Sequence, residues 1–215
     1  MDDLIRTHRR LARGASLYRA GDEFSALYAV RDGFLKTVQT LEGGREQVTG
    51  FHMAGELLGM DGIGPDAHSC DAVALEESHV CVIPYLQLAE LGREVHGLLR
   101  QFHKAMSQEI VQRHSVMLLL GTMRAEERLA TFLLDLRNRF MTRRGSSAEF
   151  NLRMTREEIG SYLGLRLETV SRTFSKFHDH GFISVAHKHV HILDVAALQG
   201  VMAGRLTAQP PHTRL

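Results

Sequence analysis

The segment LGLRLETVSRTFSKF carries Glu168, Ser171 and Arg172 close together on one side of a predicted helix. A carboxylate, a hydroxyl and a guanidinium in this spacing suit the major groove of DNA, where arginine pairs with guanine O6 and N7 and glutamate accepts from cytosine N4. Arg166 and Lys176 lie nearer the ends of the segment, where cations suit phosphates, which position a protein without specifying a sequence. The pattern predicts a helix that reads base edges, and a purely structural helix pair is the alternative.

The other side of the same helix is apolar. Leu167, Val170, Phe174 and Phe177 recur at three- and four-residue spacing, which is typical of a helix face that packs against a core. We therefore expect these four side chains to be buried and the polar side chains to point outward.

The residues before this segment predict a helix that positions it. Thr155 followed by Glu158 is a capping-box pattern, so a helix should begin in MTREE and continue through EEIGSYL. Gly164 supplies the turn, and the small Gly160 lies where two helices must cross closely. The order of helix, glycine turn and helix predicts a helix-turn-helix over residues 157–176.

Three further polar residues in this unit are expected to contact phosphates or to support the reading helix: Thr155, Arg156 and Thr169. Downstream, the runs FISV and HVHIL alternate about a turn near His187 and Lys188, which is typical of a β-hairpin wing. We therefore predict a winged helix-turn-helix domain over residues 148–215.

The N-terminal part of the chain has a different pattern. Turn signals such as Asp32-Gly33 and Gly43-Gly44 separate short β-prone runs, of which SALYAV, FLKTVQT, EQVTGF and HVCVIPY are the clearest. Many short strands at regular spacing with glycine turns predict an antiparallel sandwich or barrel, and we choose a jelly roll over residues 1–92. The expected fold class is therefore α+β.

Residues 93–121 contain no proline and carry apolar residues at helical period, so they predict one long helix. Its predicted seam steps by four and three residues, as in a coiled coil: Leu99, His103, Met106, Ile110, Arg113, Met117 and Leu120. We expect this helix to form a homodimer, and a helix that packs only on its own barrel is the alternative. In a parallel pair Arg113 would face its own copy and weaken the pairing, or would extend to solvent. A hinge and a connecting amphipathic helix are expected over residues 122–147.

Composition limits the class of protein. The chain has 215 residues and 44% hydrophobic content, no apolar run long enough to span a membrane, and an N-terminus that lacks the apolar middle of a signal peptide. We therefore expect a cytoplasmic protein with no membrane partner. Residues 121–215 hold 14 Lys and Arg against 9 Asp and Glu, whereas residues 1–120 hold 12 against 16. The basic C-terminal half favours a polyanionic partner, here double-stranded DNA.

Nearly the whole chain resembles the CRP/FNR superfamily (cyclic-AMP receptor protein/fumarate and nitrate reduction regulator), and in particular its FNR branch. The motifs are AGDEFSALYAVRDGFLK, EQVTGFHMAGELLG, ALEESHVCVIPY, MLLLGTMRAEERLATFLLDL and MTREEIGSYLGLRLETVSRTFSKF. The resemblance implies that Glu168, Ser171 and Arg172 read a TTGAT-like half-site. It also implies that the chain is a homodimeric transcription regulator, including an activator, that binds a palindromic DNA site. Such a regulator contacts RNA polymerase through loops of its barrel and controls genes of anaerobic or redox metabolism.

One departure from the family concerns cyclic nucleotides. Members of the superfamily that bind cyclic nucleotides carry an Arg-Ser or Arg-Thr pair after the Gly-Glu turn, because the arginine binds the cyclic phosphate. Here Gly55-Glu56 is followed by Ala67-His68-Ser69-Cys70, without an arginine. We expect His68 to be exposed and mostly neutral, and so unable to replace that cation. A cyclic-nucleotide-responsive regulator of the CRP type is the alternative.

A second departure concerns iron and sulfur. The resemblance implies a [4Fe-4S] cluster held by three cysteines of an N-terminal arm and one barrel cysteine, and Cys81 matches the barrel position whereas Cys70 matches none. Two cysteines are too few for four thiolate ligands. We therefore expect no cofactor and no metal in this chain as given, and a cluster only where a cysteine-rich arm precedes it.

Other candidate sites are weaker. His187, His189 and His191 share one face of a strand and could supply metal imidazoles, but no nearby cysteine or carboxylate is expected to complete the set. His52 and Glu56 match part of the metal-binding pattern of cupin enzymes, whose second histidine is missing. No nucleophile with a base and an orienting acid is recognisable. We expect no enzyme, and a cupin-like metalloenzyme is the alternative of another class.

Overall fold

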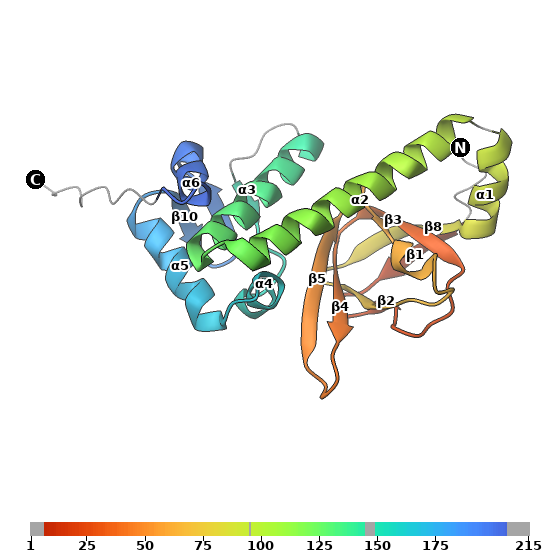
Figure 1. The fold of residues 1–215 in the computed structure, drawn as a ribbon, viewed down its shortest axis with the longest axis horizontal. Helices are drawn as coiled ribbons and strands as arrows, with labels where there is room; N and C mark the ends of the chain where they lie inside the picture. The colour runs from red at the N-terminus through yellow and green to blue at the C-terminus, as the bar shows by residue number, and fades with distance from the viewer. Residues whose placement is uncertain (1–6, 95, 145–148, 206–215) are drawn as a thin grey trace, which may run out of the picture. The chain divides into compact units, whose positions relative to one another are not determined.

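The computed structural model describes residues 7–94, 96–144 and 149–205. These residues form two compact units, one up to Ser115 and one from Val116 onward (Figure 1). Among the described residues no helix is long and apolar enough to cross a membrane.

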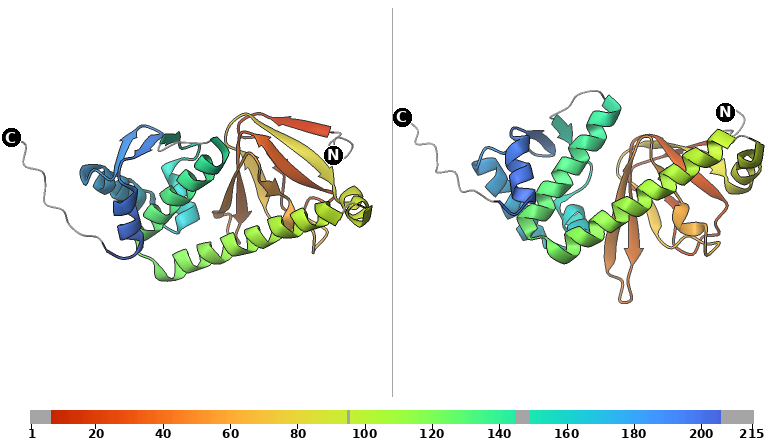
Figure 2. Two further views of the ribbon diagram at one scale, coloured as in Figure 1. Left: turned by 90° about the horizontal axis from the view of Figure 1, so that it is seen from above. Right: turned by 45° about the horizontal axis from the view of Figure 1, so that its top comes forward.

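The first unit contains two four-stranded antiparallel sheets, and both views of Figure 2 show its strands facing each other. One sheet has the order β1 (Thr7–Leu11), β8 (Ser78–Pro84), β3 (Ala26–Asp32) and β6 (Leu57–Leu58). The other has the order β2 (Ser16–Tyr18), β7 (Asp71–Ala74), β4 (Phe34–Thr40) and β5 (Glu46–Met53). Leu35, Ala72 and Val80 are fully buried between the sheets. The predicted jelly roll is confirmed, and the four strands expected from sequence are β3, β4, β5 and β8.

Two helices follow β8 where the sequence predicted one. α1 (Tyr85–Glu94) packs against β8 and β3, and α2 (His96–Thr122) is the long helix. The prediction missed α1 and began the long helix inside it, at residue 93. Pro84 directly precedes α1, a place where a residue without an N–H is tolerated because the first helical N–H groups have no intrahelical partner.

The second unit is organised around α3 (Ala125–Arg144), which packs against α5 (Leu167–Asp179) and α6 (Val195–Met202). The predicted helix-turn-helix consists of α4 (Arg156–Leu163) and α5. The predicted wing strands are β10 (Ile183–Ala186) and β11 (His189–Ile192), and β9 (Glu149–Asn151) adds a third strand beside β11. The sequence analysis missed β9 and α6, because β9 buries only Phe150 and gives no periodic signal.

Local chemistry places α4 as predicted. The Thr155 hydroxyl accepts from the Glu158 N–H at 3.1 Å, and the Glu158 carboxylate accepts from the Thr155 N–H at 2.7 Å, so the capping box is confirmed. Gly164 ends α4 with a left-handed φ of 62°. A Cβ added to Gly160 would lie 2.6 Å from the Leu165 carbonyl oxygen, which confirms a close crossing between α4 and the turn.

The buried side of α5 differs from the prediction at one position. Val170, Phe174 and Phe177 are buried as expected, together with Thr173. Leu167 is 45% exposed, so its assignment to the buried stripe is wrong. The α4–α5 crossing is filled by Leu165 and Val170 around Gly160, and Leu167 lies on the first turn of α5 beyond that contact.

The Gly160 crossing gives a stability prediction. Gly160→Ala should lower the free energy of unfolding by about 1–3 kcal/mol, because the new methyl group overlaps a main-chain oxygen that cannot move without shifting the turn. Gly121, in α2, has nothing within 4 Å of an added Cβ and is the matched control. Gly121→Ala should raise stability by up to about 1 kcal/mol. Urea unfolding followed by circular dichroism measures both, and an equally mild effect of the two variants would contradict the close crossing.

Candidate nucleic-acid interface and barrel cavity

The three residues predicted to read base edges lie on α5. Glu168, Ser171 and Arg172 are all exposed, and their spacing places them on adjoining turns of one side of the helix. The three side chains that suit base edges are therefore displayed outward from a helix whose other side is held in the core of the second unit.

Residues at the start of α5 have separate roles. Arg166 is the N-cap residue, is exposed, and makes no side-chain capping bond. Thr169 is half-buried, and its carbonyl oxygen accepts from the Thr173 hydroxyl at 2.8 Å. Of these two residues Arg166 carries an exposed charged group, and its contact with a phosphate stays a prediction.

Arg156 packs against α5 instead of extending to solvent. Its guanidinium carbon lies 3.2 Å from the centroid of the Phe174 ring, a cation–π contact. Burial lowers the pKa of Arg156 to about 10, which leaves it protonated at neutral pH. Its Nη1 is buried without a hydrogen-bond partner among the described residues. Arg156 thus supports the helix that carries the reading face.

Lys176 is tied to α3. Its Nζ donates to Glu126 Oε1 at 3.0 Å, and both side chains are about one-third exposed. This hydrogen bond from Lys176 holds the pKa of the Glu126 carboxyl below its usual range. The sequence predicts a phosphate contact for Lys176, which stays a prediction, and in the structure its ammonium joins α5 to α3. Periodicity could not show this partner, which lies 50 residues earlier in the chain.

Sequence reasoning missed Arg128, which joins three segments. Its Nε donates to the Met123 carbonyl, Nη1 to the Leu163 carbonyl and Nη2 to the Leu120 carbonyl, each at 2.9 Å. Leu163 is the last residue of α4, and Leu120 lies in the last turn of α2. Carbonyls at helix C-termini lack intrahelical partners and attract cations. Arg128 therefore fixes the end of α2 to the helix-turn-helix.

The wing brings two of the predicted histidines beside an acid. His189 Nε2 and His191 Nδ1 lie 3.5 and 3.3 Å from the carboxylate of Glu149 on β9. The expectation that no carboxylate lies nearby was wrong, because β9 was not anticipated. Within the described ranges, however, no three His, Cys, Asp or Glu side chains form a group able to hold a metal.

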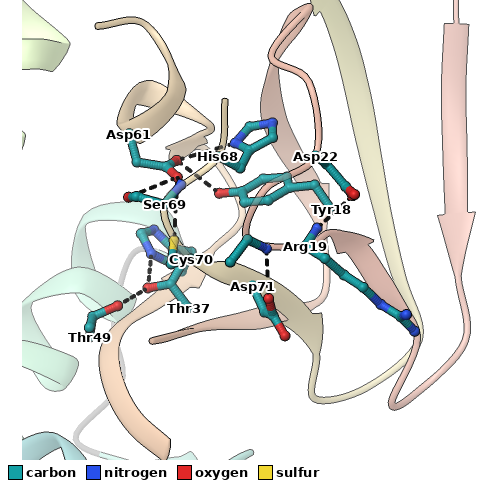
Figure 3. Close-up of polar contacts among 12 residues, drawn as sticks. Tyr18, Arg19, Asp22, Thr37, Thr49, Asp61, His68, Ser69, Cys70 and Asp71 are labelled. Carbon is teal, nitrogen blue, oxygen red and sulfur yellow. Dashed lines mark hydrogen bonds and ion pairs between the residues drawn. The ribbon is translucent and has the colours of Figure 1, made fainter. Parts of the chain in front are cut away.

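The first unit contains a cavity of about 390 Å³ between the sheets and α2. Asp61 is the central acceptor on its wall (Figure 3). Its carboxylate accepts from the Ser69 N–H at 2.8 Å, from the Tyr18 hydroxyl at 3.4 Å and from the Cys70 thiol at 3.5 Å. Burial and the Asp61 charge raise the pKa of the Cys70 thiol to about 12, and burial likewise raises the pKa of Tyr18. Both groups remain protonated donors at neutral pH.

His68 is buried, so the expectation of an exposed side chain was wrong. It is 3% exposed and stacks on Tyr18 with ring centroids 3.7 Å apart, while Phe24 meets it edge-on. Its Nδ1 lies 3.5 Å from Asp61 Oδ1, within ion-pair range but without the geometry of a hydrogen bond. His68 is thus part of the aromatic packing behind Asp61.

Arg113 reaches the same cavity from α2. Its Nη1 donates to the Thr49 carbonyl on β5, and Nε donates to Glu109 Oε1 at 2.8 Å. The guanidinium is therefore turned toward the sheet and neutralised by its own helix. The structure gives no support for like-charge repulsion between Arg113 and its copy at a dimer seam.

The exposed apolar side chains of α2 include part of the predicted seam. Met106, Ile110 and Arg113 line the barrel cavity, and Ile110 is also 53% and Met117 70% exposed. Val111 and Leu118, the next positions along the helix, are exposed as well. Among the predicted seam residues, Leu99, His103 and Leu120 are also exposed. The sequence could not show which side of α2 packs on the sheet and which side is left exposed, because apolar residues suit both the sheet and a partner helix.

The two cysteines do not form a common site. Cys81 lies on β8, is 8% exposed, and its Sγ is 3.4 Å from Nδ1 of His8, its neighbour on β1. The Cys70 thiol is protonated and donates a hydrogen bond to the Asp61 carboxylate. A [4Fe-4S] cluster needs four ligands that are mostly thiolates, so the described residues do not fit one.

Comparison with known proteins agrees with this architecture. Residues 8–94 match the cyclic nucleotide-binding domain, and residues 127–201 match the Crp-like helix-turn-helix domain. The chain is 44% identical to the transcriptional activator protein Anr of Pseudomonas aeruginosa over 96% of its own length and 84% of the relative's. It is 43% identical to the fumarate and nitrate reduction regulatory protein of Salmonella typhimurium, over 100% and 82%. The solved structure of FixK2 from Bradyrhizobium japonicum is similar, with a TM-score of 0.82 at 27% identity, covering 90% of this chain and 96% of that one.

A jelly-roll domain, a long helix and a winged helix-turn-helix with an exposed polar reading face define a DNA-binding transcription regulator, not an enzyme. The chain belongs to the FNR branch of the CRP/FNR superfamily.

The Lys176–Glu126 pair gives a pH prediction. Because the folded-state pKa of Glu126 is lowered, its contribution to stability is fully present above the ordinary value of 4.5 and is lost as pH falls through the folded value. Both side chains are about one-third exposed and water screens the pair, so Glu126→Gln should cost at most about 1 kcal/mol at neutral pH, and this difference from wild type should vanish in acid. Urea unfolding at several pH values measures it. Glu157→Gln, an exposed change on α4, should show no such pH dependence.

Proposed function

We propose that this FNR-type regulator binds a palindromic TTGAT-like site as a homodimer and controls genes of anaerobic or redox metabolism. The observation that carries the proposal is the exposed set of Glu168, Ser171 and Arg172 on α5 of a helix-turn-helix. The names of its relatives, which include a fumarate and nitrate reduction regulatory protein, support the metabolic assignment.

The chemistry of the three side chains suits this half-site. TTGAT contains a single G·C pair, which offers guanine O6 and N7 to Arg172 and the cytosine N4 amino group to Glu168. Ser171 lies about one turn after Glu168 and directly before Arg172, and its hydroxyl can donate or accept at a neighbouring base. Arg166 and the exposed wing turn at His187 and Lys188 supply the phosphate contacts.

Homodimerisation uses the exposed stripe on α2. Ile110, Val111, Met117 and Leu118 would leave a large apolar surface in water, and a parallel copy of the same helix covers such a stripe. Two copies of α5 then read two half-sites together, which is why the proposed site is a palindrome.

The proposed regulator does not respond to cyclic nucleotides. The cavity contains the Arg113 guanidinium, but Glu109 and the Thr49 carbonyl already occupy its donors, and Asp61 adds a second carboxylate. A signal therefore enters elsewhere, and a cluster would require thiolates beyond Cys81 and outside the described residues. RNA polymerase is the expected protein partner, through loops of the β domain, and the cytoplasm is the expected location.

Replacing Arg172 tests base reading. Arg172→Ala should cost about 1–3 kcal/mol on a TTGAT-like palindrome and much less on random DNA, because a lost bidentate base contact removes discrimination. Arg166→Ala is the control, and it should weaken both complexes about equally and flatten their salt dependence. Fluorescence anisotropy at fixed salt measures all four affinities. An equal loss on both DNAs would make Arg172 a phosphate contact.

Replacing Met117 tests the dimer. Met117→Glu places two like charges in the exposed stripe, so sedimentation velocity should report monomers, and affinity for the palindrome should fall with dimerisation. Gln108→Glu adds the same charge at an exposed position on another side of α2 and should leave the dimer intact. A dimer that survives Met117→Glu would move the interface away from α2.

A further inference from the structure

The strand β5 contains a β-bulge at Thr49. Along the β4–β5 ladder Thr37 pairs with Gly50 and Val38 pairs with Val48, so Thr49 is an extra residue with no Cα partner on β4. A bulge interrupts the regular ladder and locally redirects the strand. The bulge therefore gives β5 one position at which the side chain and the carbonyl can be aimed away from the ladder.

Buried polar contacts hold the bulge in place. The Thr49 hydroxyl donates to the Thr37 hydroxyl at 3.0 Å (Figure 3), and the Thr37 oxygen lies 3.4 Å from Nε2 of His52. Thr37 and His52 are both buried. A Cβ added to Gly50 would lie 2.8 Å from His52 Nε2 and 2.9 Å from the Thr37 hydroxyl oxygen, so glycine is required beside this pair. The Thr49 carbonyl thus belongs to a part of the sheet that close packing keeps from shifting.

Arg113 joins this carbonyl to α2. Its Nη1 donates to the Thr49 oxygen, while Nε and Nη2 lie 2.8 and 2.6 Å from Oε1 of Glu109, one turn earlier on the same helix. The guanidinium is planar with donors in fixed directions, so a carboxylate and a carbonyl that bind it together determine how it lies. The contact thereby fixes the direction in which α2 faces β5.

The rotation of α2 about its own axis decides where its apolar side chains point. Each residue of a helix advances by about 100°, so Met106 and Arg113 share one side, and both line the cavity. Val111 is 60% exposed and points roughly 140–160° away from those two side chains. Ile110 lies between these directions, and it both lines the cavity and is exposed. A roll of α2 toward the sheet would therefore turn its exposed apolar stripe against the β domain.

We propose that Arg113 is a positioning residue for dimerisation: its hydrogen bond to the Thr49 carbonyl holds the rotation of α2 at which the apolar stripe faces a second copy. The inference rests on the proposed homodimer. The cavity wall includes Leu57 and Met60, so the β domain itself competes for the apolar side chains of α2. Arg113 acts by excluding that competing arrangement and not by contact with the second copy.

Sedimentation velocity over a concentration series measures the dimer dissociation constant. Arg113→Gln should raise it about three- to tenfold, because one charge-assisted hydrogen bond in a partly exposed site is lost. Arg113→Lys keeps the charge but has no planar fork to bridge the carboxylate and the carbonyl, so it should fall between wild type and Arg113→Gln. Arg100→Gln removes an exposed arginine elsewhere on α2 and is the matched control, with a constant within about twofold of wild type.

Deleting Thr49 tests the same contact from the strand. The deletion removes the bulge, leaves the flanking β4–β5 pairs in register and does not alter the charge of α2. It should raise the dimer dissociation constant by a similar factor, and its combination with Arg113→Gln should be no weaker a dimer than either change alone. A merely structural effect of the deletion on the β domain would instead add to the effect of Arg113→Gln.

The outcomes separate the inference from the proposed function. An unchanged or tighter dimer in Arg113→Gln, or additive effects of the two changes, would overturn the inference and leave the dimer on α2 in place. If thermal unfolding shows that the deletion variant does not fold, the Arg113 substitutions alone decide, since they leave the sheet intact. If Met117→Glu also leaves the dimer unchanged, the interface lies away from α2, and both the inference and the proposed dimer are wrong.

Discussion

The guanidinium of Arg128 holds together the segments on which DNA reading depends. It donates to the carbonyls of Leu120, Met123 and Leu163, which belong to the end of α2, the connection to α3 and the end of α4. Each helix end would otherwise leave carbonyl groups without intrahelical partners. One planar cation with several fixed donors satisfies all three, which a lysine ammonium on a flexible stem could not do in the same geometry.

This link has a functional consequence because α2 carries the exposed apolar stripe and α5 carries the reading face. A dimer reads two half-sites only if its two recognition helices are held about one helical repeat of DNA apart. Arg128 ties the last turn of α2 to the turn before α5, while Lys176 and Arg156 hold α5 against α3 and α4. Two of the cations that the sequence predicts as phosphate or supporting contacts, Arg156 and Lys176, thus orient the helix, whose outward side carries Glu168, Ser171 and Arg172.

The sequence predicts the parts of this structure that depend on local chemistry. The capping box at Thr155, the glycine at the α4 turn and four of the strands of the sandwich, β3, β4, β5 and β8, follow from spacing and backbone preference alone. Prediction from the sequence fails where an apolar or charged residue has two competing partners. Leu167 fits a helical stripe, yet it is 45% exposed, and Thr173 is buried beside Val170, Phe174 and Phe177 instead. Arg113 fits a coiled-coil seam, yet a sheet carbonyl and Glu109 bind it. Such choices depend on contacts between residues distant in sequence, which periodicity does not encode.

The same long-range contacts decide what the β domain can sense. Its fold matches the cyclic nucleotide-binding domain, but the cavity is occupied by internal pairs: Glu109 neutralises Arg113, and Asp61 accepts hydrogen bonds from Ser69, Tyr18 and Cys70. An entering phosphate would have to displace the Glu109 carboxylate from the Arg113 guanidinium and would remain near the Asp61 carboxylate. Each of these requirements disfavours the binding of an anion in a partly buried site. The chain therefore shares the fold of the cyclic nucleotide-binding domain, while the charges that line this cavity are already paired with one another. The proposal that cyclic nucleotides are not the signal follows from this pairing and not from the fold.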